Sequence, residues 1–229
     1  MPVAAIGTYV AIGGHEVDLM VSLFGLAGLL WGLAADRIAA RWPAHEDGSV
    51  RKVDWRTPVV VIFAGVALAA VPVRFDDLGQ RLLFGAFFAA CVLLMATDLD
   101  QKLLPDVVTL PLIVLGALAL VSGGDSLVSR SSVWSTVIGA VAVPGLMFLA
   151  SLPFGEGAFG AGDVKFLLAV GLLAGLVRIV IAVFAGAMLG GVVIFALLIA
   201  RRVTLRSYVP FGPFLIMGAV WGLLLPASS

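Results

Sequence analysis

The chain has 229 residues, of which 62% are hydrophobic and 12% are charged, with 14 basic residues balanced by 14 acidic ones. Soluble domains usually carry about 45–50% apolar and about 25% charged residues, so this composition excludes an ordinary soluble domain and a disordered chain. The single cysteine, Cys91, excludes a disulfide framework, and the zero net charge excludes a basic nucleic-acid binder. We therefore expect a polytopic membrane protein in contact with a lipid bilayer.

Eight apolar runs follow one another along the chain, separated by charged and turn residues. Each is near the roughly 20 residues that cross a hydrocarbon core as a helix. The predicted spans are residues 17–35, 57–73, 80–97, 107–122, 134–152, 158–177, 179–200 and 208–226. The sequence therefore predicts an all-α polytopic membrane protein of about eight transmembrane helices.

The basic residues divide unequally between the two sides of these spans. With the first connection placed inside, ten lie on the inner side: Arg37, Arg41, Arg51, Lys52, Arg56, Lys102, Lys165, Arg201, Arg202 and Arg206. Four lie on the outer side: Arg74, Arg81, Arg130 and Arg178. Because basic residues favour the cytoplasmic side, this predicts that both termini lie outside. In the inner connection 36–56 we expect the acids Asp36, Glu46, Asp47 and Asp54, and also His45, to be exposed to water.

The segment 97–106, with the sequence TDLDQKLLPD, joins the third and fourth predicted spans on the inner side. Asp98 directly follows an apolar run and is expected at the membrane boundary, after a helix C-terminus whose dipole disfavours negative charge. Asp100 is expected to be solvated. Pro105 suits a turn or a first helical turn, and Asp106 can stabilise the start of the next helix.

The segment 155–165, with the sequence GEGAFGAGDVK, precedes an apolar stretch that is short for a span. Val164 to Val177 reaches about 21 Å as a helix, less than a core of about 30 Å. The span therefore needs the glycine-rich residues before it, which draws Asp163 toward membrane depth on irregular backbone. Such backbone is tolerated where it is buried in protein or lines a wet cavity. The alternative is an aspartate that caps a helix, with glycines that serve helix packing.

Asp98 and Asp163 fall on the same side by the charge count. Two carboxylates that meet in a low dielectric share a proton, the arrangement with which aspartic proteases activate water and polarise a carbonyl. The residues therefore suggest a membrane-embedded aspartyl hydrolase. A proton-coupled transporter would use the same two aspartates, and a structural scaffold would leave the glycine-flanked Asp163 unexplained.

The segment 208–214, with the sequence YVPFGPF, opens the last predicted span on the inner side. Two prolines around a glycine interrupt a regular helix, which could shape a substrate groove. The alternative is a helix start with a proline in its first turn.

Together these three segments resemble the type IV prepilin leader peptidases, GxGD-type membrane aspartyl proteases related to the preflagellin peptidases. The first motif, GxGD followed by a hydrophobic residue and Lys, is matched by Gly160, Gly162, Asp163 and Lys165. The second motif, an Asp seven residues before a Pro-Asp pair, is matched by Asp98, Pro105 and Asp106. The late PFGP element is matched by Pro210, Phe211, Gly212 and Pro213.

The resemblance implies that Asp98 and Asp163 are the catalytic pair and that they face the cytosol. It implies a multi-pass protein of the plasma (inner) membrane that cleaves the leader from prepilin-like membrane proteins. The peptidase domain would extend over residues 1–229, with its catalytic core at about 80–226 and a weaker match over 1–73. The inner-face acids Asp100 and Glu156 could attract a positively charged leader.

The sequence departs from many larger members, which carry a four-cysteine domain between the first two spans, linked to N-methylation of the new amino terminus. Here that connection is short and free of cysteine, so it offers no CxxC zinc site, and N-methyltransferase activity is doubtful. His15 and His45 form no HExxH pair. We expect no metal and no other cofactor.

Overall fold

The structure is a computed structural model that describes residues 3–45, 48–123, 132–154, 160–202, 204 and 210–225. Within these ranges the chain is helical and contains no strand, which confirms the predicted all-α fold. The elements are α1 (Val3–Ala39), α2 (Arg56–Arg74), α3 (Leu78–Gln101), α4 (Asp106–Gly123), α5 (Val133–Ser151), the short 3-10 helix η1 (Leu152–Phe154), α6 (Ala161–Ile199) and α7 (Gly212–Leu224).

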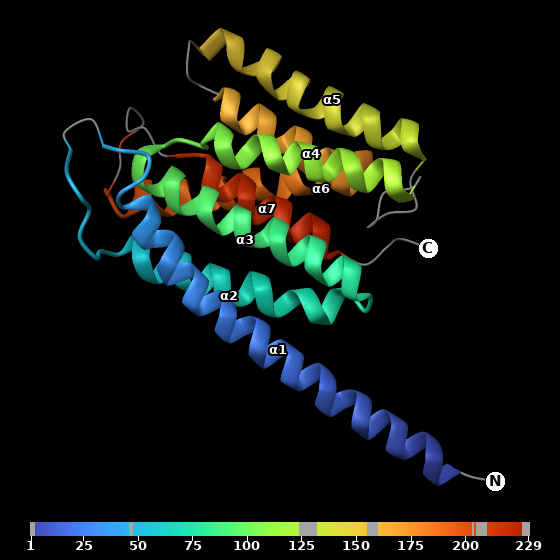
Figure 1. Cartoon of the computed structure of the whole chain (residues 1–229). Coiled ribbons are helices and arrows are strands. Elements are labelled where there is room, and N and C mark those ends of the chain that lie inside the picture. The colour runs from blue at the N-terminus through green and yellow to red at the C-terminus, as the bar shows by residue number, and fades with distance from the viewer. Residues whose placement is uncertain are drawn as a thin grey trace.

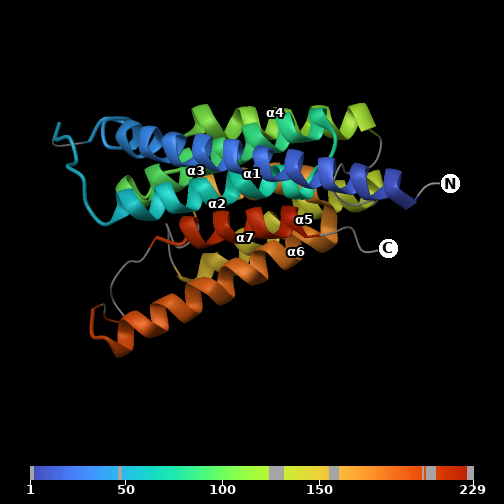
Figure 2. The same cartoon turned by 90° about the horizontal axis from the view of Figure 1, so that it is seen from below.

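The helices lie side by side along a common direction, with α1 and α2 at one edge of the bundle and α5 at the other (Figure 1). We call the end that holds the connection between α1 and α2 the connection end. Helix α1 begins and α7 ends at the opposite end of the bundle (Figures 1 and 2). The start of α1 and the end of α7 therefore lie on the same side of the bundle. Which side of the membrane this is stays a prediction.

Within the described part of the chain, five helices are long and apolar enough to cross a membrane: residues 19–39 of α1, and the whole of α2, α3, α5 and α6. Residues 106–121 of α4 and the whole of α7 are shorter apolar helices. Many large apolar side chains are exposed on the outside of the bundle, among them Leu30, Val66 and Phe184. Such a surface suits contact with lipid and not with water, so the chain is a multi-pass membrane protein.

Helix α6 contains both of the predicted spans 158–177 and 179–200. Gly175 interrupts it, with φ 75° and ψ 172°, values outside the helical region. This break divides α6 into a first arm, 161–174, and a second arm, 176–199. Glycine suits the position because an L side chain is strained at such a positive φ.

The second arm of α6 runs back along α7 toward the connection end (Figure 2). At the break, Nη1 of Arg178 donates to the carbonyl oxygen of Leu225, at the C-terminal end of α7, over 2.6 Å. Further along, Gly186 lies against Leu215 near the start of α7. Residue numbers thus rise along one helix as they fall along the other, so the two are antiparallel. The boundary predicted between residues 177 and 179 lies within a few residues of the observed break.

Three other boundaries differ from the prediction. The predicted span 17–35 lies inside the longer α1, which includes Asp36. Helix α3 continues past residue 97 to Gln101, so Asp98 lies within the helix and not after it. Helix α7 begins at Gly212 and not at residue 208, with Pro213 in its first turn. This confirms the helix-start alternative for the PFGP segment.

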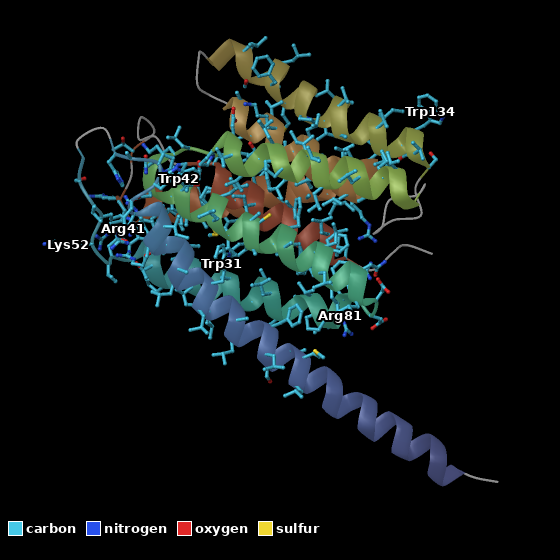
Figure 3. The ribbon with its side chains drawn as sticks, viewed as in Figure 1. Trp31, Arg41, Trp42, Lys52, Arg81 and Trp134 are labelled. Carbon is cyan, nitrogen blue, oxygen red and sulfur yellow. The ribbon has the colours of Figure 1, made fainter. Side chains whose placement is uncertain are left out.

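The core centres on α3. The ring of Phe84 stacks on Phe75 with centroids 4.1 Å apart, and Nε1 of Trp31 in α1 donates to the carbonyl oxygen of Ala89 over 2.8 Å (Figure 3). Cys91 is fully buried in this core, where it packs as a small apolar residue. Helix α3, which carries Asp98, is thereby held by neighbours on several sides.

Candidate active site

Asp98 lies in the last turn of α3, at the connection end. The helix closes at Lys102, which adopts the left-handed conformation (φ 57°, ψ 39°) and donates its amide to the carbonyl oxygen of Asp98 over 2.9 Å. The Asp98 residue is 4% exposed, and within the described part of the chain its buried Oδ2 has no hydrogen-bond partner. A buried carboxylate oxygen without a partner is costly and therefore points to function.

Asp163 lies in the first turn of α6. Its Oδ2 accepts a hydrogen bond from the amide of Gly160 over 3.2 Å, so one oxygen stabilises the start of the helix. Its Oδ1 is buried and has no partner among the described residues. The N-cap of the helix is Gly160 and Asp163 is its third residue, so the alternative of an N-cap aspartate was wrong, although one oxygen of Asp163 does contact the N-cap amide.

Asp98 and Asp163 line one pocket of about 270 Å³ at the connection end. Because both aspartates line this one small pocket, their side chains lie near each other. The remaining lining residues come from three places. Lys102, Leu103 and Leu104 follow α3; Gly160, Ala161 and Gly162 lie at the start of α6; and Pro210, Phe211 and Gly212 lie at the start of α7. The fold therefore brings together the three segments that the sequence singled out.

Two motif glycines allow a close approach in this pocket. A Cβ at Gly162 would stand 2.9 Å from the Cβ of Leu104, so the GxGD segment lies directly against the segment that follows α3. Gly212 lies against the carboxylate of Asp98. In both positions the absence of a side chain sets how closely the walls of the pocket can approach.

Lys165 and Asp106 form an ion pair beside the pocket. Nζ of Lys165 donates to both carboxylate oxygens of Asp106, each over 2.7 Å. Asp106 lies in the first turn of α4, as predicted, and Pro105 accepts the first backbone hydrogen bonds of that helix, from Val108 and Thr109. The ion pair therefore joins the start of α4 to the first turn of α6, two residues after Asp163.

Asp100 is not solvated, so that prediction was wrong. Its side chain is 2% exposed, and its carboxylate lies 2.6 Å from Nε of Arg51, 2.8 Å from Nη1 of Arg56 and 3.0 Å from Nε2 of His45. The physical reason is that α3 continues to Gln101 and carries Asp100 against the basic residues of the connection between α1 and α2. Contact between Asp100 and a substrate leader stays a prediction, and these three groups already occupy the carboxylate.

Asp36 is also buried, contrary to the prediction that it is exposed to water. It lies within α1, where it pairs with Arg37 and Arg51 and accepts a hydrogen bond from Oγ1 of Thr57 over 2.8 Å. Burial alone would lower the pKa of the Arg51 guanidinium, but the carboxylates of Asp36 and Asp100 outweigh it and hold this pKa above its ordinary value. We call Asp36, Arg51, Arg56 and Asp100 the ion cluster; it fixes the connection to α1 and α3.

The other acids and His45 of this region differ in exposure. The side chain of Asp54 is 34% exposed, so it is only partly exposed, and it pairs with Arg51. The side chain of His45 is 18% exposed and lies against Asp100, so the prediction that it is exposed to water was wrong. Glu46, Asp47 and Glu156 lie outside the described residues. Among the described residues no three His, Cys, Asp or Glu side chains gather in a way that could hold a metal ion.

Lys102, Leu103 and Leu104 also line the pocket with the aspartates, although they were not predicted as site residues. Their place in the sequence could have indicated this, because they lie between Asp98 and Pro105. So short a segment keeps its residues close to the motif residues at its two ends.

An all-α, multi-pass membrane protein with two buried aspartates in one pocket is the class that the fold and the site define. A model of the type IV leader peptidase family matches residues 85–195, a segment that contains both aspartates. The matched segment, residues 85–195, belongs to the type IV leader peptidase family.

Three relatives illustrate the similarity, and each carries the name prepilin leader peptidase/N-methyltransferase. The protein from Xanthomonas campestris pv. campestris is 31% identical over 182 residues, which cover 76% of this chain and 62% of the relative. The one from Dickeya chrysanthemi is 30% identical over 181 residues, 76% of this chain and 61% of the relative. The one from Aeromonas hydrophila is 35% identical over 144 residues, 60% of this chain and 47% of the relative.

The chain thus spans only about half to three-fifths of the length of these curated relatives. No solved structure matches it.

Proposed function

We propose that the chain is a membrane-embedded aspartyl endopeptidase that removes the leader from prepilin-like substrates, with Asp98 and Asp163 as its catalytic pair. The observation that carries the proposal is the shared pocket of the two aspartates, each of which has a buried carboxylate oxygen without a partner among the described residues. The names of the relatives support the substrate class.

The proposed reaction divides the work between the two carboxylates. The ionised one takes a proton from water while the oxygen of that water forms a bond to the scissile carbonyl carbon. The protonated one donates a hydrogen bond to the carbonyl oxygen, where negative charge develops. When the C–N bond breaks, the aspartate that took the water proton passes it to the leaving amine nitrogen. The other product leaves as a carboxylic acid that keeps the second hydrogen of the water. The pair thereby returns to one proton for two carboxylates.

The active site is proposed to face the cytosol. Nine of the ten residues of the predicted inner basic set lie in described ranges, in or beside helix ends at the connection end; Arg41 and Lys52 illustrate this position, with Arg81 at the opposite end (Figure 3). Because basic residues favour the cytoplasmic side, the aspartate pocket would open where the leader of a substrate is located.

The test is co-expression of the chain with a prepilin-like substrate, with leader loss followed by mass spectrometry of the substrate. Asp98→Asn and Asp163→Asn should each abolish cleavage, because each removes a carboxylate that must exchange a proton. Asp76→Asn is the matched control: Asp76 is exposed and lies between α2 and α3, at the opposite end of the bundle. Cleavage that survives either pocket substitution would contradict the aspartyl mechanism.

The transporter alternative predicts a different result with the same protein. A wild-type chain that leaves the leader intact but moves protons across liposome membranes would support transport through the two aspartates. Methyl transfer is not included in the proposal, because the connection between α1 and α2 has no cysteine.

A further inference from the structure

A second and larger cavity lies beside the aspartate pocket. Its volume is about 830 Å³, against about 270 Å³ for the pocket. We call it the apolar groove; the residues that matter here are Met95 and Leu99 of α3, Val193 and Leu197 of α6, Met217 of α7, and Pro210. Pro210 also lines the aspartate pocket, so the two cavities share a wall.

The groove lies where the second arm of α6 diverges from the rest of the bundle. In Figure 2 this arm runs away from α1, α2 and α3 as it approaches the connection end. The arm stays packed on α7 at Gly186 and Gly190, whereas beyond these residues its side chains Val193 and Leu197 face the groove. Trp55 and Val59, beside and within α2, form the opposite wall.

We propose that the apolar groove binds the hydrophobic helix of the substrate, which directly follows the bond to be cut. This inference rests on the proposed peptidase function and names the surface that holds its substrate. A helix within the groove would end at the connection end, where Pro210 and the last turn of α3 separate it from the aspartates. The scissile bond at the end of that helix would then reach the pocket.

The positions along α3 support this placement. Met95 and Leu99 face the groove and Asp98 faces the pocket, so a single helical turn presents both surfaces. Apart from Arg202, the residues that line the groove are apolar. Such walls suit the apolar side of a helix and not a positively charged leader. Because lipid chains are as apolar as leucine, a helix gains little there from the hydrophobic effect and most from close packing. Binding should therefore be sensitive to bulk in the groove.

Photo-crosslinking tests the occupant directly. A photoreactive amino acid is placed at Val193 or Met217 in the Asp98→Asn protein, which should hold the substrate without cutting it. Matched controls carry the probe at Val114 and Val121, exposed residues of α4 that do not line the groove. We expect adducts with the hydrophobic helix of the substrate at the two groove positions and not at the controls. Adducts with lipid or with a second copy of the chain, in place of the substrate, would overturn the inference.

A kinetic test uses bulk in the groove. Met217→Trp should raise KM for the membrane substrate roughly tenfold, a change of about 1.4 kcal/mol in binding. Cleavage of a soluble peptide that contains the scissile bond but lacks the helix should be impaired much less by Met217→Trp. Val114→Trp should change neither activity.

If Met217→Trp slowed cleavage of the membrane substrate and of the soluble peptide equally, the inference would be overturned. The substitution would then act on the aspartates themselves and not on binding of the substrate helix. A wild-type chain that cuts neither substrate would instead contradict the proposed function, and the crosslinking pattern would still decide who occupies the groove.

Discussion

Gly212 lies so close to Asp98 that a Cβ at Gly212 would stand 2.6 Å from Oδ2 and 2.7 Å from Cγ of the aspartate. Real Cβ atoms essentially never make such contacts with a carboxylate. The start of α7 therefore forms a backbone wall for the Asp98 side chain. This gives the glycine of the PFGP element a physical reason: any side chain there would displace the carboxylate.

Gly212→Ala should lower kcat for leader cleavage roughly 100-fold, because a displacement of about 1 Å in a reacting group has effects of that size. Helix content measured by circular dichroism should stay unchanged. Gly145→Ala is the control, since a Cβ at Gly145 would meet nothing within 4 Å. Normal cleavage by Gly212→Ala would mean that Asp98 is not held in the position described.

The sequence predicted the helical class and the three segments of the site because each leaves a local signal. A run of about 20 apolar residues indicates a membrane span, and an acidic residue at the edge of such a run is unusual enough to be noticed. The sequence did not predict the environment of Asp100 or Asp36, because a charge beside several arginines has the same composition whether it is solvated or paired. Burial of the ion cluster depends on where α3 ends, and that end is set by the left-handed Lys102.

The sequence predicted the apolar groove only in part, through the two prolines of the segment 208–214, which both line it. Most of its other walls come from apolar residues of α2, α3, α6 and α7 that look like ordinary residues of a span. The groove exists because the second arm of α6 diverges from the other helices. The sequence of one apolar helix does not indicate whether that helix packs against its neighbours or diverges from them.

Gly175→Ala should destabilise the protein by about 1–3 kcal/mol, because the positive φ of 75° strains any L side chain. Thermal unfolding in detergent, followed by circular dichroism, measures the change. Gly191→Ala provides the comparison: it lies within the second arm of α6, and its added Cβ would meet nothing within 4 Å. Equal stability of the two variants would argue against the break at Gly175.

Asp100→Leu should lower the free energy of unfolding by a few kcal/mol, since removing one partner from a buried ion pair leaves the other charges uncompensated. Arg51 and Arg56 would keep only their pairs with Asp36 and Asp54. The exposed pair Lys165–Asp106 gives the contrast, because its side chains are 34% and 56% exposed. Lys165→Met should change stability by less than about 1 kcal/mol. Denaturation in detergent measures both variants, and a smaller effect at Asp100 would contradict the burial of the ion cluster.

The Lys165–Asp106 pair should matter for activity more than for stability, because it joins the first turn of α6, which carries Asp163, to the start of α4. Lys165→Glu places two carboxylates together and should lower kcat about tenfold by moving this turn. The double variant Asp106→Lys with Lys165→Glu restores an ion pair between the same two positions and should recover most of that loss. If Asp106 instead attracts a positively charged leader, the exchange would leave a lysine facing the leader, and KM would rise without recovery. Steady-state kinetics of the single and double variants therefore separate a positioning role from a role in substrate attraction.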